Sequence, residues 1–373
     1  MKRGFFIYML AFTLFSCEPT ISEFQSENYL KLFGSGYECR GSDVIELADG
    51  SCVLTGYDRQ ENDDKQILLV KVDENGNQIW FNTYGNTEID DQGVVVREVS
   101  DGLLAVGISD SAGIARPFIL KAGANGDSLW YKTFGSQDTD IMVEDVTLDE
   151  TSMYVAGYAI QPGNSLTSRY SARLSLDGEL MWQYFYSLNS NSSFRRVFLR
   201  ENHVLLLGDD GQEDKISMVI ADKSSGVPAD EKKLDAVGET LADAMLTGEA
   251  LFILANGASG MLLYKLSLSF EVVWETEPID AIIGKTMALQ GNGSMILLGE
   301  DVFEGASRIN PIEVSESGVT AYGSEEFRTI PGTVSRMRPA NNNCLIMIGS
   351  TNATFGTNAQ LIKTGADLFL LKP

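Results

Sequence analysis

One motif returns along the chain and limits what the chain can fold into. Residues 73–85 read DENGNQIWFNTYG, residues 124–135 read ANGDSLWYKTFG, and residues 175–187 read SLDGELMWQYFYS. Each copy joins a tight Asn-Gly or Asp-Gly turn to a short strand that carries a tryptophan. Repetition of this kind is typical of proteins built from similar units that pack on one another.

A second mark, an apolar run that ends in glycine, gives the period of the repeat. It occurs at Gly56, Gly107, Gly157, Gly208, Gly299 and Gly349, with Ala255 in the place of one glycine, so that successive marks lie 44 to 51 residues apart. The first unit reads as four short strands, at residues 43–47, 51–57, 66–73 and 78–84. Units of this length and strand number in a ring are typical of β-propellers. The sequence therefore predicts an all-β fold over residues 29–373, a seven-bladed β-propeller with four-stranded blades.

The start of the array predicts how the units meet. Residues 29–34 (YLKLFG) match residues 80–85 (WFNTYG), so the array begins part-way through a unit. Either this N-terminal strand or a C-terminal strand at residues 368–372 closes the ring. We expect the four tryptophans to wedge between adjacent blades, because a single unit cannot bury both faces of its sheet. They are Trp80, Trp130, Trp182 and Trp274.

The N-terminus has the features of an export signal. Lys2 and Arg3 precede an apolar run at residues 5–15, which is too short to span a bilayer. The run ends in Leu-Phe-Ser-Cys17, which resembles the lipobox of bacterial lipoproteins; the alternative is an ordinary secretory signal. The resemblance implies a signal peptide at residues 1–16, a lipidated Cys17 with a flexible tether over residues 17–28, and attachment to the bacterial outer membrane through the lipid.

The repeat also resembles a known group of proteins. It is similar to the tryptophan-bearing propeller repeats of Bacteroidota surface lipoproteins and, more distantly, to the tryptophan-docking motif of quinoprotein dehydrogenases, which Asp73, Gly76 and Trp80 match with one residue fewer. A quinone site usually also has a vicinal cysteine pair, and this chain has no adjacent cysteines. The resemblance therefore implies the propeller without the quinone site, and no cofactor.

Charge and cysteine content restrict the partners. With 28 Lys and Arg against 52 Asp and Glu, the net charge is −24, which disfavours nucleic acid. We expect a monomer held to the membrane by its lipid, with a protein or glycan partner.

A Cys39–Cys52 bridge suits an oxidising compartment, but the turn at residues 49–50 pairs Cys52 near Leu47. This register favours free buried thiols at Cys39, Cys52 and Cys344.

Few residues have a pattern that suggests catalysis. His203 is the one histidine, so a Ser-His-Asp triad and a histidine-rich zinc site are disfavoured. The acidic loops at residues 58–64 and 138–140 lack the pattern of an EF-type calcium loop. Carboxylate-pair chemistry stays open, since six acidic residues lie at or near the first strands of the units. They are Asp43, Asp90, Asp91, Glu144, Asp145 and Asp243.

The first strands of the units predict the position of a ligand site. These strands converge on the central channel, and alignment on the repeated glycine brings there Arg195, Arg196, Arg336, Arg338 and Asp145. One interpretation is a set of structural salt bridges. The other is a positive patch that captures a carboxylate or sulfate group of an acidic glycan.

Two further serines and the overall function complete the predictions. Ser111 and Ser128 lie in Asp-Ser-apolar tripeptides that resemble the acceptors of Bacteroidota O-glycosylation.

The sequence favours a lipid-anchored, non-enzymatic binding or scaffold module for glycans or other envelope proteins. The alternatives are a glycan-active enzyme that uses carboxylates and an outer-membrane assembly factor.

Overall fold

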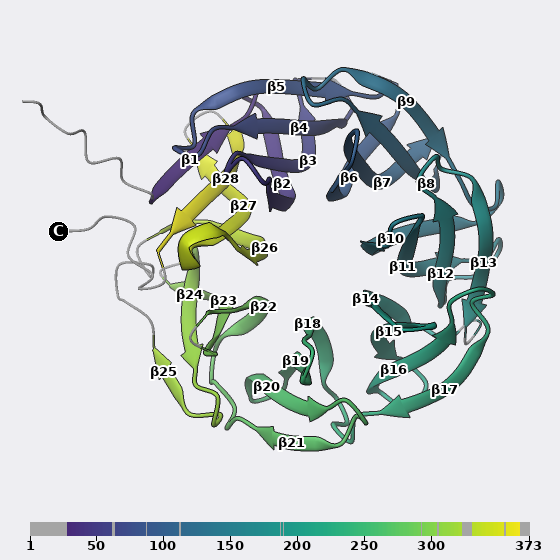
Figure 1. Ribbon diagram of the computed structural model, residues 1–373, viewed down its shortest axis with the longest axis vertical. Helices are drawn as coiled ribbons and strands as arrows, with labels where there is room; N and C mark the ends of the chain where they lie inside the picture. Colours follow the sequence, from purple (N-terminus) through teal and green to yellow (C-terminus); the bar gives the residue numbers. More distant parts are fainter. Residues whose placement is uncertain are drawn as a thin grey trace, which may run out of the picture.

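The chain forms a ring of β-sheets around a central channel (Figure 1). The computed structural model describes residues 28–61, 64–86, 88–111, 113–186, 188, 190–291, 293–303, 306–322, 330–353 and 356–365. Cys17 and a C-terminal strand at 368–372 lie outside these residues. In the described ranges no helix is long and apolar enough to cross a membrane.

Five sheets are separate four-stranded blades, each with its first strand nearest the channel. The first blade consists of β6 (Asp90–Val99), β7 (Gly102–Ser111), β8 (Ile114–Ala122) and β9 (Ser128–Thr133). The second consists of β10 (Asp140–Leu148), β11 (Ser152–Ile160), β12 (Thr167–Ser175) and β13 (Leu180–Tyr186). The third consists of β14 (Ser193–Arg200), β15 (His203–Asp210), β16 (Lys215–Asp222) and β17 (Pro228–Lys233). The fourth consists of β18 (Thr240–Leu246), β19 (Ala250–Gly257), β20 (Gly260–Ser267) and β21 (Val272–Glu275). The fifth consists of β22 (Ile283–Leu289), β23 (Met295–Phe303), β24 (Ala306–Val314) and β25 (Thr320–Tyr322).

The first and last repeats are not separate blades, so the prediction of seven four-stranded blades is wrong. Their strands form one eight-stranded sheet in the order β26-β27-β28-β2-β3-β4-β5, with β1 paired to β28. These strands are β1 (Tyr29–Phe33), β2 (Glu38–Glu46), β3 (Cys52–Arg59), β4 (Gln66–Val72), β5 (Gln78–Tyr84), β26 (Thr333–Pro339), β27 (Leu345–Ala353) and β28 (Gly356–Thr364). A 3-10 turn, η2 (Asn341–Asn343), lies between β26 and β27.

The physical reason for the merged sheet is the short connection between β1 and β2. The N-terminal strand β1 runs antiparallel to β28 from Tyr29, opposite Lys363, to Phe33. The chain then turns into β2 within four residues, which brings Tyr37 beside the start of β28. There Thr357 donates its backbone N–H to the Tyr37 carbonyl at 3.1 Å, and Glu38 pairs with Thr357 in parallel. The N-terminal strand therefore closes the ring, next to β28 (Figure 1).

The tryptophans lie between neighbouring blades, as the sequence predicts. Trp182 Nε1 donates a hydrogen bond to the Lys223 carbonyl of the next blade at 3.2 Å, and its ring lies under the turn at Gly226. Trp80, Trp130 and Trp274 contact Gly126, Gly178 and Gly318 in the same way. At the closing joint, Tyr29 of β1 lies against Gly76, so a tyrosine replaces the tryptophan there. The repeated turn and the repeated tryptophan are thus the two halves of one contact between blades.

Apolar side chains fill the joints between the sheets. One cluster joins Val106 and Ile119 of one blade to Val143, Val155 and Tyr170 of the next. The middle strands are buried on both faces, which explains their continuous apolar sequences. The predicted free thiols are confirmed, since Cys39, Cys52 and Cys344 are buried and unbridged.

Candidate functional site: the charge cluster of the central channel

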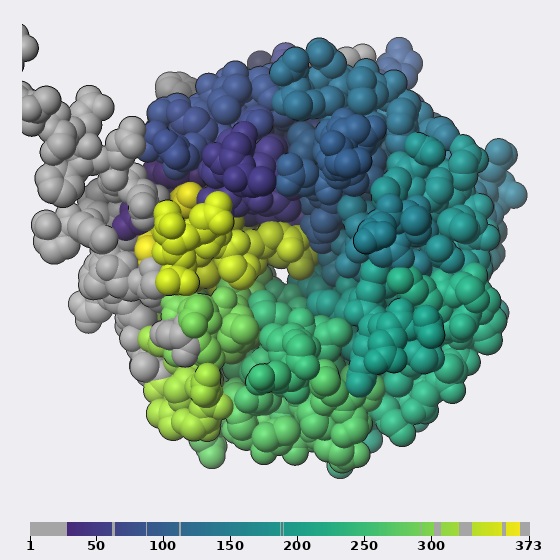
Figure 2. Space-filling model, in the orientation of Figure 1, coloured from purple at the N-terminus to yellow at the C-terminus, as the bar shows by residue number. Residues whose placement is uncertain are grey.

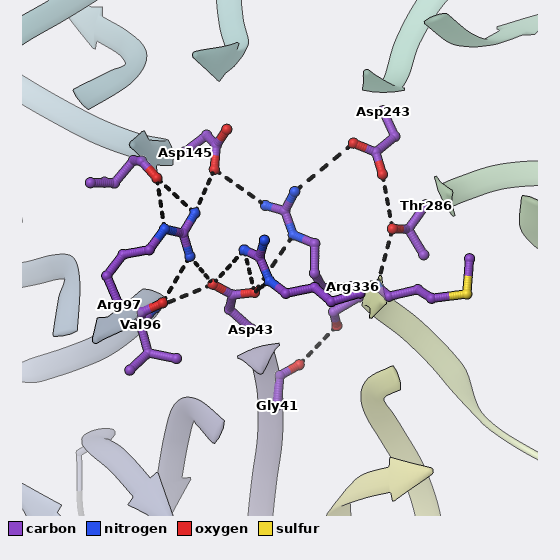
Figure 3. Close-up of polar contacts among 12 residues, drawn as sticks. Gly41, Asp43, Val96, Arg97, Asp145, Asp243, Thr286 and Arg336 are labelled. Carbon is purple, nitrogen blue, oxygen red and sulfur yellow. Dashed lines mark hydrogen bonds and ion pairs between the residues drawn. The ribbon is translucent and has the colours of Figure 1, made fainter. Parts of the chain in front are cut away.

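Each innermost strand has a β-bulge at the same place, and the bulges bring polar side chains together at the centre. A bulge adds one residue to one strand, bends that strand and re-aims the side chains near it. The register shifts lie between Gly41 and Asp43, Gly93 and Val95, Val143 and Asp145, Phe194 and Arg196, Leu241 and Asp243, Gly284 and Thr286, and Val334 and Arg336. Five of the residues that follow a bulge, together with Arg97 of β6, are labelled in Figure 3. With Arg196 and Arg338 they make up what we call the channel cluster: Asp43, Arg97, Asp145, Arg196, Asp243, Thr286, Arg336 and Arg338.

The acidic and hydroxyl side chains of the cluster connect neighbouring inner strands. In each case an oxygen on one strand accepts a backbone N–H from the next innermost strand of the ring. The pairs are Asp43 with Val96 at 3.2 Å, Asp145 with Val197 at 3.2 Å, Asp243 with Met287 at 3.0 Å, and Thr286 with Met337 at 3.1 Å. The carboxylates therefore satisfy backbone donors that would otherwise be buried without a partner.

Three of the four arginines pair closely with these carboxylates. Arg338 binds Asp43 through two bonds of 3.0 Å, and Arg97 binds the same carboxylate at 2.7 Å. Arg196 binds Asp243 at 2.5 Å. Asp43 is fully buried, and burial raises its pKa, but the Arg338 and Arg97 guanidiniums outweigh burial and lower the pKa to about 2. The carboxylate is therefore held in its ionised form.

Arg336 has a different environment from the other three arginines. Its guanidinium lies 3.8 Å from Asp145 and 3.9 Å from both Asp43 and Asp243, so it lies between three carboxylates that are bonded elsewhere (Figure 3). Its Nε is buried and has no hydrogen-bond partner among the described residues. Burial and the nearby Arg196 lower the pKa of Arg336, against the opposing effect of the three surrounding carboxylates.

The cluster carries a surplus positive charge beside a cavity. Its four arginines and three aspartates give these eight residues a net charge of +1 in a chain whose net charge is −24, and Glu144, which interacts electrostatically with Arg196 and Arg336, lies just outside the set. A cavity of about 240 Å³ adjoins the cluster, and Arg97, Arg196, Arg336 and Arg338 line it together with apolar side chains such as Met287. Figure 2 shows the narrow opening at the centre of the ring. Such a site offers guanidinium donors to one small anionic group.

The structure brings together four of the five channel residues singled out in the sequence. Asp145, Arg196, Arg336 and Arg338 all line the cavity. Arg195 does not line it, because it is the extra residue of its bulge and binds Asp209 at 2.8 Å instead. Sequence reasoning missed Arg97, because the alignment selected Val94 and Val95 on this strand. Side chains alternate along a β-strand, so Arg97, two residues beyond Val95, lies on the same face as Val95.

The remaining predicted residues lie outside the channel cluster: Asp90, Asp91 and Glu144 on the innermost strands β6 and β10, and Ser111, Ser128 and His203 on other strands. Ser111 ends β7 and Ser128 begins β9; both are exposed, and both line one cavity on the same blade. His203 is exposed at the start of β15. Within the described ranges, His, Cys, Asp and Glu side chains form no group that could hold a metal ion.

Comparisons with known proteins identify the fold. No family model and no curated protein matches the sequence. Among solved structures, the WD40 β-propeller domain of Doa1 has a TM-score of 0.57 and 14% identity, and the match covers 90% of this chain and 97% of that one. Virginiamycin B lyase from Staphylococcus aureus has a TM-score of 0.56 and 12% identity, and the match covers 90% of this chain and 99% of that one. The Pan2 WD40 domain of Neurospora crassa has a TM-score of 0.56 and 9% identity, and the match covers 87% of this chain and 88% of that one. The chain is a β-propeller. Identities this low establish the fold alone, since one propeller architecture serves unrelated functions.

Proposed function

We propose that this propeller is a non-enzymatic binding module of the bacterial cell envelope, anchored in the outer membrane by a lipid on Cys17. Its ligand carries a carboxylate or sulfate group, as in an acidic glycan, and that group binds at the channel cluster. The protein is a surface lipoprotein of the Bacteroidota type, whose propeller repeats its own sequence resembles.

The N-terminal sequence supports the location. Lys2 and Arg3, the apolar run at residues 5–15 and Cys17 follow one another as they do in a lipoprotein signal. Two or more acyl chains on one cysteine give stable anchoring, at about 0.8 kcal/mol for each buried methylene. The ring begins at Tyr29, so the lipid and the closing strand β1 are separated by a short polar segment.

The environment of Arg336 is the observation that supports the ligand class. The buried guanidinium of Arg336 has an Nε without a hydrogen-bond partner and lies 3.8–3.9 Å from its three carboxylates, beyond hydrogen-bond distance, so it retains unused hydrogen-bonding capacity. The other cluster arginines are committed to Asp43 and Asp243, and through them to the backbone of the next blade. An anionic group in the cavity would complete the partners of Arg336 and neutralise the surplus charge of the cluster. Catalysis is not part of the proposal, because Asp43 and Asp243 are bonded to arginine and are poorly suited to proton transfer.

The test is a change at Arg336 with a matched control at Arg195. Arg336→Met removes the guanidinium but leaves Asp43, Asp145 and Asp243 each with another bonded arginine, so the ring stays folded. Arg195→Met removes an equal charge outside the cavity. On an array of sulfated oligosaccharides that contain no uronic acid, we expect the wild type and Arg195→Met to bind, and Arg336→Met to lose about tenfold or more in affinity.

Two results would overturn the proposal. The first is a wild-type protein that binds no acidic oligosaccharide on the array. The second is equal binding by Arg336→Met and Arg195→Met at similar melting temperatures, which would leave the cluster with a structural role only. Arg196→Ala is a poor probe, because it leaves the buried carboxylate of Asp243 without its guanidinium, a loss that costs about 3–5 kcal/mol in comparable buried pairs.

A further inference from the structure

A second cavity lies away from the channel, on the β6–β9 blade. Its volume is about 450 Å³, and its lining comes from the face of this blade and from the connection between β5 and β6. Apolar and aromatic side chains such as Ile89, Leu120 and Tyr131 line it together with seven polar or charged residues. Pockets of this size are typical of small-molecule sites.

Three polar residues form a row across the floor of this cavity. Asp91 of β6 pairs with Ser109 of β7, and Ser109 pairs with Arg116 of β8, so their side chains project from the same face of the sheet. Asp91 is 2% exposed and accepts the Asn86 backbone N–H at 3.2 Å and the Tyr131 hydroxyl at 3.5 Å. Burial raises the pKa of Asp91. The Ser109 hydroxyl also donates to this carboxyl, whose remaining lone pairs can accept a hydrogen bond from a ligand hydroxyl.

Arg116 is the cation of this row, and it lacks a partner in the described part of the chain. Its Nε is buried without a hydrogen bond, and no described carboxylate forms an ion pair with it. Most buried polar side-chain atoms in proteins are hydrogen-bonded, so an unpaired arginine facing a cavity needs an explanation. A ligand carboxylate would provide the missing acceptor.

The next blade shows that the propeller does not require this polar cavity. In the β10–β13 blade the corresponding row is Ile141, Ala159 and Ser168, and all three are fully buried. A Cβ on Gly85 would collide with Asp91, and a Cβ on the equivalent Gly135 would collide with Ile141, so the two sites match in geometry. Apolar packing fills this position in the β10–β13 blade, whereas the same position in the β6–β9 blade is an open cavity with charged side chains.

We infer that the β6–β9 cavity binds a small carboxylate built on a hydroxylated ring, as in a uronic acid. Arg116 takes the carboxylate, Asp91 accepts a ring hydroxyl, and the ring lies against Tyr131 and Leu120. Tyr131 is 40% exposed and is supported from behind by stacking on Phe118, at 5.3 Å between ring centroids. The aromatic face and the two charged groups together fit a sugar acid better than a neutral sugar or an apolar ligand. This site is independent of the channel cluster.

Calorimetry with D-glucuronate as the probe, and D-glucose as its uncharged counterpart, tests the inference. We expect glucuronate to bind and glucose not to bind. Arg116→Met should weaken glucuronate binding about 10- to 100-fold, the range for one charge-assisted contact. The control is Lys132→Met, on the same blade, where the ammonium pairs with Glu179 outside the cavity. Arg336→Met should bind glucuronate normally, which separates this site from the channel.

A second variant copies the neighbouring blade. The combination of Asp91→Ile, Ser109→Ala and Arg116→Ser installs the row that the β10–β13 blade already packs, so folding should be retained and the melting temperature should rise. Glucuronate binding should disappear. The inference is overturned if wild-type protein does not bind glucuronate, if Arg116→Met and Lys132→Met bind it equally, or if the folded triple variant still binds it.

Discussion

The contact between Trp182 and Gly226 predicts a measurable difference between two glycine substitutions. Gly226 has φ +74°, and a Cβ built on it would lie 2.6 Å from Cε3 and Cζ3 of the Trp182 ring. Gly163 has the same φ of +74°, but a Cβ there would have no neighbour within 4 Å. Gly163→Ala is therefore a matched control, because it changes the backbone strain without the contact between blades.

The size of the difference follows from the two costs. Alanine in the left-handed region costs about 1–2 kcal/mol, partly offset by a less flexible unfolded chain, and both effects apply equally to Gly163 and Gly226. Crowding a well-packed site adds about 1–3 kcal/mol. We therefore expect Gly226→Ala to reduce the free energy of unfolding by about 1–3 kcal/mol more than Gly163→Ala does.

Equilibrium unfolding in urea, followed by circular dichroism, measures this difference without relying on tryptophan fluorescence. If Trp182 causes the extra loss, Trp182→Leu should make Gly226→Ala less costly, and a double-mutant cycle reports that coupling. Equal losses for Gly226→Ala and Gly163→Ala, or no coupling to Trp182, would refute the reasoning that the turn and the ring form the contact between blades.

Three further predictions concern the anchor, the channel and the outer surface. Cys17→Ala should release the protein from the membrane fraction or leave an uncleaved precursor; partition with membranes at high salt would contradict the lipid anchor. The pKa of Asp43 is lowered to about 2, so its stabilising effect is complete above about pH 4 and is lost as the pH falls toward 2. The stability difference between wild type and Asp43→Asn, measured by urea unfolding, should shrink over that range, and a constant difference would show that the carboxylate charge contributes nothing. Intact mass of protein from its native host should show glycan on Ser111 or Ser128, and a mass without any sugar increment would dispose of the O-glycosylation.

The repeat could be predicted from the sequence because local chemistry produces it. An Asn-Gly or Asp-Gly turn followed by a strand with a tryptophan forms the same structure in each unit. The match of Tyr29 to Trp80 left open whether the N-terminal or a C-terminal strand closes the ring, and the pairing of β1 with β28 and the contact of Tyr29 with Gly76 show that β1 does. The sequence predicts that the first strand of the first full unit begins at Asp43, whereas β2 begins at Glu38, since the pairing continues through the bulge.

The channel site was only partly predictable, because its register differs between units. Gly41 pairs with Gly56, 15 residues later, whereas Gly93 pairs with Gly107, 14 residues later. A fixed count back from the repeated glycine therefore aligned Asp43 with Val94, although the residue after the bulge is Val95. It also placed Arg195 at the channel, where the bulge turns it toward Asp209.

The sequence by itself determined the repeated strand unit, the turns and the acidic balance of the chain, because each depends on residues close together or on composition. It also determined that the tryptophans lie between blades, because a repeated unit with two apolar faces must pack on its neighbours. Only the tertiary structure decided that the first and last repeats share one eight-stranded sheet, and that Arg338 binds Asp43 across 295 positions of sequence. Ring closure brings the two ends of the chain together, and no local pattern records which side chains then meet. The Nε atoms of Arg336 and Arg116 that lack a hydrogen bond arise in the same way, since an acceptor lies within reach or not only when distant strands have packed.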